Sequence, residues 1–576
     1  MDQEKRVLIA FALSFGVLLL WRALLVKVQP PPPRPTTPAT TSPRIAPGQQ
    51  SAVPSPAATL PSEHAVPHLA VTQGNKPQEI DIDGRDLYRV TFSTEGAVVK
   101  SWVLKKYRDA KENPLDVVNR AACEKLGFPM SLNVSDPEIS AKLNSAIYVA
   151  SPANASLPAP ARVDFLYSDG KIQARKQFTF GPGYEAHAEV SVFDGERYLP
   201  LEVTWPGGFG DHSLSYATQE ALTRAVYGAP DHLTAVAQGK VKEGEDRRVP
   251  GPLLLAGLED RFFVDIFLPD SSDDSFRFAR QVWTPPDWTG EEKNKPKPLT
   301  AALGTPLARP LSFRLFVAPK DLDVLRAARP PLDGLVDFGW FSIVARPLFV
   351  AMRYIYDHWI HNYGWAIVIL TVLINLAMFP LKLKSIRSAQ EMQRIAPIVK
   401  GIQDKYKQYK LNDPRKQRMN QEVMKVYQEH NINPLGGCLP MVVQLPFLYG
   451  FYRVLDLSIE LRHAPWILWV RDLSSPDSYH LFGFPLSILP TVMIITMFIL
   501  QKMTPVATVD PAQQRMMMVM PLIFGIMFYN FASGLVLYWL TGNIVGIAQQ
   551  AFINRMIPPA QPGRPVRRPP EAEVEK

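Results

Sequence analysis

The residues that invite a chemical interpretation are amides and hydroxyls set inside long apolar stretches of the second half of the chain. Thr371 and Asn375 lie one helical turn apart. Such groups are costly within a bilayer unless they face other helices or water. The sequence therefore predicts either hydrogen bonds between packed helices or a hydrated groove that contacts a substrate, and we favour the groove. Its candidate residues are Thr371, Asn375, Gln444, Trp539, Asn543 and Gln550, of which the last three share one helical face.

Motifs for catalysis and for nucleotide binding are absent from the sequence. It contains no GxxxxGK[ST], HExxH, GxSxG or CxxC string. The two cysteines, Cys123 and Cys438, exclude a cysteine-rich metal site and a disulfide scaffold. His187, His212 and His232 are scattered, and single histidines are more often structural than catalytic. We expect no enzymatic activity, no cofactor and no metal.

Six apolar segments are candidates for the membrane-spanning helices that would hold these polar groups. They comprise residues 7–26, 364–381, 435–454, 482–500, 516–531 and 535–553. The first resembles a signal peptide, but no cleavage site follows it, so we expect it to remain as an anchor. Residues 338–361 mix aromatic and charged side chains and predict an amphipathic helix at the membrane surface.

Two extramembrane regions lie between the first and second spans. Residues 29–77 contain thirteen prolines and few large apolar side chains, which predicts a disordered linker. Residues 78–330 contain short alternating segments such as Tyr88–Phe92 and Leu201–Trp205, separated by turn residues. We therefore expect a large all-β sandwich in this region.

The distribution of charge predicts the topology. Residues 382–430 contain twelve basic and five acidic side chains, a net charge of +7, and the tail 554–576 carries further arginines. The loop 456–481 is acidic by comparison. Basic segments remain on the cytoplasmic side of a membrane. We therefore predict that 382–430, the short loop 501–515 and both termini are cytoplasmic, and that the β domain lies outside.

Within the basic segment, apolar residues from Met392 to Tyr409 recur at spacings of three and four, and Met419, Val423 and Val426 form a second stripe. Asp413 and Pro414 are typical of a helix start between them. These patterns predict an antiparallel helical hairpin with a basic outer face. That face is a candidate docking surface for acidic lipid, a ribosome or an incoming chain, or it is only a solvated loop. The docking candidates are Lys400, Lys405, Lys407, Arg415, Lys416 and Arg418.

Several strings together resemble the YidC family of membrane protein insertases. They are Asn433-Pro-Leu-Gly-Gly-Cys-Leu-Pro-Met-Val-Val-Gln-Leu-Pro-Phe, Gln501-Lys-Met-Thr-Pro, Asp510-Pro-Ala-Gln-Gln and Ser533-Gly-Leu-Val-Leu-Tyr-Trp. They occur in family order over roughly 220 residues of the chain. The layout is similar to that of the Gram-negative members, with one span, a periplasmic β-sandwich and a five-span core in the inner membrane.

The resemblance implies a groove in the inner leaflet that receives nascent hydrophobic segments and releases them laterally, alone or with the Sec translocon. A ribosome is a further possible partner, through the basic hairpin and tail, and DNA is not expected. One position departs from the family: Asn375 stands where members usually carry a groove arginine. We therefore expect a polar groove without a central charge, since Lys382 would lie about 10 Å nearer the cytoplasm along the helix.

Two other functions are compatible with parts of the sequence. A secondary transporter would explain the spans, but the sequence has no inverted repeat and no buried ionisable pair for ion coupling. A membrane-tethered sugar-processing enzyme would explain the β domain, and it would lose its activity if residues 78–330 were deleted.

Overall fold

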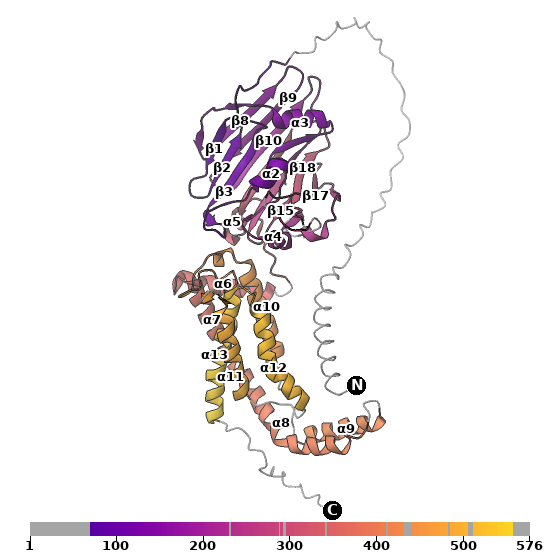
Figure 1. The fold of residues 1–576 in the computed structure, drawn as a ribbon, viewed down its shortest axis with the longest axis vertical. Coiled ribbons are helices and arrows are strands. Elements are labelled where there is room, and N and C mark those ends of the chain that lie inside the picture. Colours follow the sequence, from indigo (N-terminus) through magenta and orange to yellow (C-terminus); the bar gives the residue numbers. More distant parts are fainter. Residues whose placement is uncertain are drawn as a thin grey trace, which may run out of the picture.

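The computed structural model describes residues 69–229, 232–286, 288–291, 295–339, 342–409, 413–430, 439–477, 479–481, 484–504 and 511–556. The predicted first span, most of the linker, nearly all of the C-terminal tail and Cys438 lie outside these residues. The described chain consists of a β-rich domain followed by a helix bundle, stacked along one long axis (Figure 1).

The β domain contains a nine-stranded sheet and two five-stranded sheets. The large sheet has the order β13 (His232–Ala237), β12 (Arg224–Ala229), β15 (Leu255–Glu259), β16 (Phe263–Pro269), β19 (Leu311–Pro319), β10 (Glu185–Phe193), β9 (Gln173–Phe180), β8 (Ala161–Ser168), β6 (Val149–Ser151). One small sheet is β4 (Pro114–Asp116), β3 (Val98–Arg108), β2 (Tyr88–Ser93), β1 (Glu79–Asp83), β7 (Ser156–Pro158). The other is β14 (Asp246–Val249), β17 (Ser275–Arg280), β18 (Leu299–Thr305), β11 (Leu201–Trp205), β5 (Ser131–Val134). Short helices α2 (Arg120–Leu126), α3 (Pro137–Ser145) and α4 (Tyr216–Leu222) lie between strands, and α5 (Leu322–Ala327) follows β19.

Both small sheets pack on the same face of the large sheet. The Phe92 ring of β2 lies 4.9 Å from Phe178 of β9, and Tyr227 of β12 lies 6.0 Å from Phe278 of β17, measured between ring centroids. The alternating apolar pattern causes this arrangement, because every second side chain of a strand points to the same face. Along β9, for example, Ala174, Lys176, Phe178 and Phe180 are buried, while the residues between them are more exposed.

A lysine lies in the middle of this core. The Lys176 side chain is fully buried, and its Nζ donates to the carbonyl oxygens of Gly96 at 2.6 Å, Ala97 at 3.2 Å and Met130 at 2.7 Å. Burial lowers the pKa of Lys176 to about 7, because desolvation penalises the ammonium. The lysine therefore joins the large sheet to two turns that would otherwise leave carbonyl groups unsatisfied.

The helix bundle follows the β domain. Its elements are α6 (Ser342–His358), α7 (Tyr363–Ala377), α8 (Phe379–Lys405), α9 (Pro414–Glu429), α10 (Leu439–Leu457), the turn η4 (Ile459–Leu461), the hairpin β20 (Tyr479–Leu481) and β21 (Phe484–Leu486), α11 (Ile488–Met503), α12 (Pro511–Phe528) and α13 (Ser533–Met556). Helix α13 is the central element, because it packs against α7, α10 and α11 and its Trp539 contacts Phe528 of α12.

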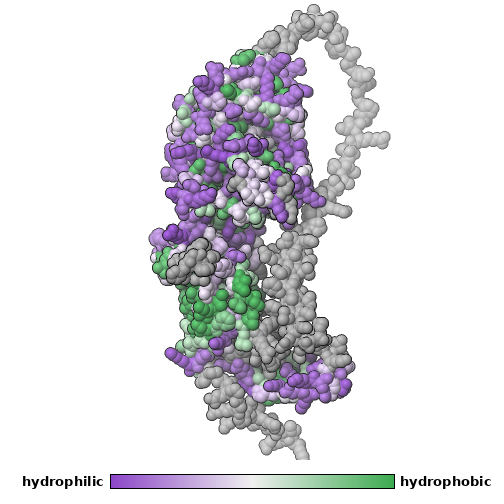
Figure 2. All heavy atoms as spheres, in the orientation of Figure 1, coloured by the Kyte–Doolittle hydropathy of each residue, from purple (hydrophilic) through white to green (hydrophobic). Residues whose placement is uncertain are grey.

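The outer surface of the bundle is apolar. Exposed side chains include Leu376 on α7, Phe498 on α11, Ile526 on α12 and Ile544 on α13. Figure 2 shows an apolar zone between the hydrophilic β domain and a hydrophilic region around α8 and α9. Among the described residues, α13 is long and apolar enough to cross a membrane, and α7 with α8 meets the same criterion as one bent span.

The second predicted span does not continue as one helix to residue 381. Helix α7 ends at Ala377, and α8 starts at Phe379 with its axis bent by 55°. Pro380 explains the bend, because a proline has no N–H to donate and its ring crowds the carbonyl group of the preceding turn. The bend directs α8 away from the bundle and towards α9 (Figure 1).

Helices α8 and α9 pack together through a small apolar cluster. Met392, Ile395 and Val399 are buried on α8, and Val423, Val426 and Tyr427 of α9 pack against them. The predicted start of α9 is confirmed: Asp413 is the N-cap, its side chain accepts from the N–H of Arg415 at 2.9 Å, and Pro414 is the first helical residue.

Ion pairs hold the β domain against the bundle. Arg462, which follows η4, pairs with Asp211 of the β domain, and both side chains are almost fully buried. Arg261 of the β domain pairs with Asp456 of α10 at 3.1 Å, and Arg353 of α6 pairs with Asp323 of α5. Breaking the buried Arg462–Asp211 pair would leave an uncompensated charge, so this contact keeps the two parts in a defined orientation.

A buried carboxyl group lies in the same interface. Glu460 is surrounded by Asp321 and Asp323 of α5, Arg353 of α6, Tyr107 of β3 and Tyr363 of α7. Its Oε1 atom has no hydrogen-bond partner among the described residues. Burial, together with the two aspartates, raises the pKa of Glu460 to about 7.

The first prediction concerns the buried lysine. Lys176→Met should destabilise the β domain by about 3 kcal/mol, because three carbonyl groups lose their donor. Thermal unfolding of the full-length protein in detergent, followed by tryptophan fluorescence, should show a lower midpoint. Lys171→Met, at an exposed position, is the control. An equal midpoint for both variants would contradict the structural role of Lys176.

The second prediction concerns the pH dependence of the interface. The pKa of Glu460 is raised in the docked state, so docking is strongest below about pH 4.5, the ordinary value, and weakens as the pH rises through about 7. Hydrogen exchange of residues 456–464 in the full-length protein should therefore be faster at pH 8 than at pH 5.5, after correction for intrinsic rates. Glu460→Gln should remove this difference, whereas the exposed control Glu196→Gln should retain it.

Candidate functional site

The polar residues of the bundle form two separate clusters, one on each side of α13. This arrangement follows from the sequence of α13, which places amides on more than one face of a helix that is buried on several sides. Thirteen of its residues are buried, among them Asn543, Gln549 and Gln550. Gln549 contacts α7 and Asn543 contacts α11, whereas Gln550 bonds Asn554 of α13 itself.

The first cluster joins α7, α8 and α13. The side chain of Asn375 donates from Nδ2 to the Thr371 carbonyl at 2.9 Å, and Gln549 donates from Nε2 to the Asn375 carbonyl at 3.0 Å. Lys382 of α8 donates from Nζ to Asn375 Oδ1 at 3.2 Å and to Gln549 Oε1 at 3.1 Å. Asn375 and Gln549 are 7% and 9% exposed, so this network is largely shielded from solvent.

The expectation of a groove without a central charge is wrong in one respect, because Lys382 supplies an ammonium to Asn375. The distance of about 10 Å along the helix was calculated between backbone positions and did not include the length of the lysine side chain. A lysine side chain is long and can carry its charge back along a helix. Lys382 follows Asn375 by seven residues, which is two helical turns, and this spacing was the signal in the sequence.

The second cluster joins α13 to α11. Asn543 donates from Nδ2 to the Met493 carbonyl at 3.3 Å and to Thr496 Oγ1 at 3.2 Å. Gln550 donates to Asn554, which in turn donates to the Met503 carbonyl at 3.2 Å. These bonds join two packed helices. This is the arrangement expected if the polar residues connect helices and do not line a groove.

The remaining candidates contact further helices. Gln444 of α10 hydrogen-bonds the hydroxyl group of Tyr538 on α13. The Trp539 ring lies 5.6 Å from Phe524 and 4.9 Å from Phe528 of α12. The six sequence-predicted residues thus lie on three helices, α7, α10 and α13, but the structure does not gather them at one point. Gln549 and Lys382 complete the α7 cluster and were not among the predicted site residues.

The basic candidates lie on the α8–α9 pair and around its turn. Lys400, Lys405, Lys407, Arg415 and Arg418 are exposed, and Lys416 is partly buried. Arg415 is engaged locally, since it pairs with Asp413 at 3.1 Å and its guanidinium lies 4.0 Å from the centre of the Tyr409 ring. The other exposed cations form a positive surface at the end of the molecule remote from the β domain.

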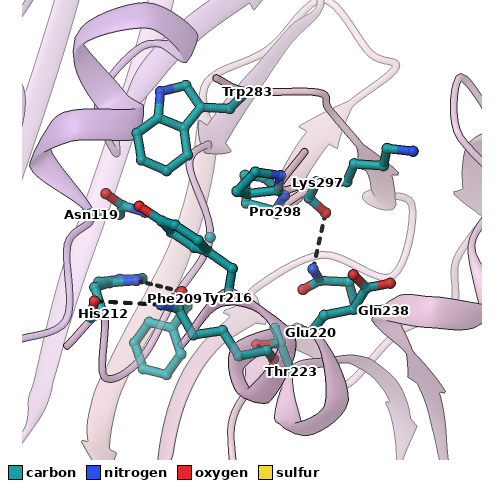
Figure 3. Close-up of a pocket in the computed structure, with 13 residues that line it drawn as sticks. Asn119, Phe209, His212, Tyr216, Glu220, Thr223, Gln238, Trp283, Lys297 and Pro298 are labelled. Atoms are coloured by element: carbon teal, nitrogen blue, oxygen red, sulfur yellow. Dashed lines mark hydrogen bonds between the residues drawn. The ribbon is translucent and has the colours of Figure 1, made fainter. Parts of the chain in front are cut away.

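The β domain has a pocket of its own, between α4 and the loops around Phe209 and Pro298 (Figure 3). His212 lines it and is held in place, with Nε2 3.0 Å from the Val117 carbonyl and Nδ1 3.4 Å from Gln219 Oε1. Glu220 pairs with Arg280 at 2.7 Å. These groups are engaged with their neighbours, and within the described ranges no group of three or more metal-ligating side chains occurs.

Two family models match the chain. Residues 355–560 match the family described as "60Kd inner membrane protein", and residues 80–351 match the YidC periplasmic domain. The division between the two models lies close to the division between the β domain and the helix bundle.

Curated relatives match over nearly the full length. The membrane protein insertase YidC of Syntrophus aciditrophicus is 34% identical, with 96% of this chain and 99% of the relative covered. The insertase of Geobacter metallireducens is 33% identical, with 97% and 99% covered. Among solved structures, an active YidC insertase is 17% identical with a TM-score of 0.34, covering 84% of this chain and 94% of that chain. By its matches to both family models and to full-length relatives, the chain belongs to the YidC family of inner-membrane protein insertases.

Proposed function

We propose that the helix bundle receives hydrophobic segments of nascent membrane proteins in a polar groove of the inner leaflet and releases them laterally into the bilayer. Insertase activity is the function of the family. The observation that carries the finer proposal is the polar network of Lys382, Asn375 and Gln549 inside a bundle whose outer surface is apolar. Here we call a nascent membrane protein that is being inserted a client. Each unsatisfied polar group of a client would cost several kcal/mol in hydrocarbon, and a polar site part of the way into the bilayer lowers this cost.

The proposed topology has six spans with both termini in the cytoplasm and the β domain in the periplasm. The positive charge of residues 382–430 supports this orientation. The apolar zone of the bundle and the two hydrophilic ends of the molecule are compatible with it (Figure 2). In this arrangement the α8–α9 pair forms a cytoplasmic helical hairpin.

The proposed partners follow from this orientation. The exposed cations Lys400, Lys405, Lys407 and Arg418 would attract anionic lipid headgroups or a ribosome that delivers a client. The Sec translocon would pass client segments laterally to the bundle. The β domain would act as a scaffold, and its buried Arg462–Asp211 pair and partly buried Arg261–Asp456 pair to the bundle support a fixed position.

The decisive experiment is reconstitution of the full-length protein into liposomes without translocon or nucleotide. Insertion of a client with one or two spans is scored by protection from added protease. Insertion above that of empty liposomes would establish an autonomous insertase. Absence of insertion by correctly folded protein would instead indicate a folding factor that depends on the translocon.

The third prediction tests the polar network. Asn375→Leu removes one of the two side-chain acceptors of Lys382 and should reduce insertion of clients with polar tails about tenfold, which corresponds to one charged hydrogen bond. Leu376→Ala changes an exposed apolar side chain on the same helix and serves as the control. Unchanged insertion by Asn375→Leu would contradict a role for the network in receiving polar segments.

A further inference from the structure

A tight turn with an exposed apolar tip follows η4 in the helix bundle. The Trp466 N–H donates to the Val470 carbonyl at 3.0 Å, and the Val470 N–H donates to the Ile467 carbonyl at 3.1 Å. Leu468 lies at the tip, where its φ is +53° and its side chain is 82% exposed. The neighbouring Ile467 is exposed as well. We call residues 466–470 the apolar turn.

Leucine is an unfavourable residue at this tip for two reasons. A positive φ brings Cβ close to a carbonyl oxygen, so glycine or asparagine is the usual choice there. Exposure to water also loses the free energy that burial of the side chain would provide. A leucine that is both strained and exposed, beside an exposed isoleucine, indicates that the tip contacts an apolar partner outside the chain.

The apolar turn is held firmly against the start of α7. Asn362 is the N-cap of α7, and its side chain accepts from the Trp365 N–H at 3.1 Å. The same side chain donates from Nδ2 to the carbonyls of Pro465 and Trp466, both at 3.2 Å. The rings of Trp365 and Trp466 lie 5.7 Å apart. The direction in which the tip points is therefore fixed relative to α7.

The surroundings of the turn indicate which partner it meets. Helix α6 lies at the end of the bundle next to the β domain (Figure 1), and Trp359, directly after it, is exposed, as is Trp365 at the start of α7. Arg471, directly after the turn, is exposed too. Tryptophan and arginine beside aliphatic side chains are typical of the boundary between lipid headgroups and acyl chains. The turn also adjoins α7, whose exposed Leu376 belongs to the apolar outer surface of the bundle.

We propose that the apolar turn inserts into the bilayer leaflet nearest the β domain, with the side chains of Ile467 and Leu468 at the boundary between headgroups and acyl chains. This inference goes beyond the proposed function, because it requires only that the bundle lies in a membrane. Since Asn362 joins the turn to the N-terminus of α7, the turn fixes the depth at which α7 enters the lipid.

The fourth prediction concerns the depth of the tip. The full-length protein with Cys123→Ala and Cys438→Ala is spin-labelled at Leu468→Cys and placed in vesicles of phosphatidylethanolamine and phosphatidylglycerol. The label should collide more often with oxygen, which concentrates among acyl chains, than with a water-soluble nickel complex. The ratio of the two collision rates should correspond to a depth of about 5 to 10 Å in the boundary region.

Two further labels calibrate this ratio. Leu307→Cys replaces an exposed leucine in the turn before β19, and β19 carries the chain from there to α5 beside the bundle. This matched control should give the ratio of bulk water. Ile526→Cys, on the apolar outer surface of α12, should give the ratio of the acyl region.

A label at Ile467→Cys tests the leucine itself. Leu468→Gly preserves the turn, because glycine adopts a positive φ without strain, but it removes the apolar tip. It should shift the Ile467 label towards collisions with the nickel complex. Leu468→Met keeps an apolar side chain and should leave the label at its original depth.

Three results would overturn the inference. Equal collision ratios at Leu468 and Leu307 would place the turn in water. Protection of the Leu468 label from both reagents would show that protein covers the tip, as a second copy of the chain could. An unchanged depth of the Ile467 label in Leu468→Gly would show that the leucine side chain is not used. None of these measurements depends on insertion of a client, so they are independent of the proposed function.

Discussion

The structure of the bundle depends on one constraint, which is that polar groups within an apolar environment must find partners inside the protein. Helix α13 meets this constraint on several sides, through Gln549 towards α7 and Asn543 towards α11. Each of these bonds fixes the distance and rotation of a neighbouring helix, because amides have directional donors and acceptors. The same groups that would contact a client thus also hold the bundle together.

The two parts of the molecule use polar contacts differently. In the β domain, Lys176 is buried among three backbone carbonyls and connects parts of a rigid core. In the bundle, Lys382 is held by two side-chain amides that lie on two different helices. The lysine of α8 therefore connects α7 and α13 through their side chains.

The interface between the two parts combines a buried ion pair with a carboxyl group of raised pKa. Arg462 and Asp211 exclude water from their contact, and Glu460 lies beside them in a setting that favours its protonated form. Electrostatic contacts of this kind specify one orientation, because a displaced charge would remain buried without its partner. The β domain is therefore held against the periplasmic side of the proposed topology by contacts that respond to proton concentration.

Much of this protein could be predicted from the sequence, because its determinants are local. Alternation of apolar residues specified strands such as Leu201–Trp205, and Asp413 with Pro414 specified a helix start. The length of the apolar segments and the distribution of charge indicated a membrane protein, and short sequence motifs indicated its family. These features depend on neighbouring residues, so they do not require knowledge of the tertiary structure.

The tertiary structure decided which polar residues meet. Gln549 and not Gln550 faces Asn375, because the rotation of α13 is set by its packing against several helices at once. Lys382 reaches Asn375 although their backbones lie two turns apart, because its long side chain extends back along α7. Distances between side chains on different helices depend on helix rotation and side-chain conformation, and the sequence alone determines neither at the level of single hydrogen bonds.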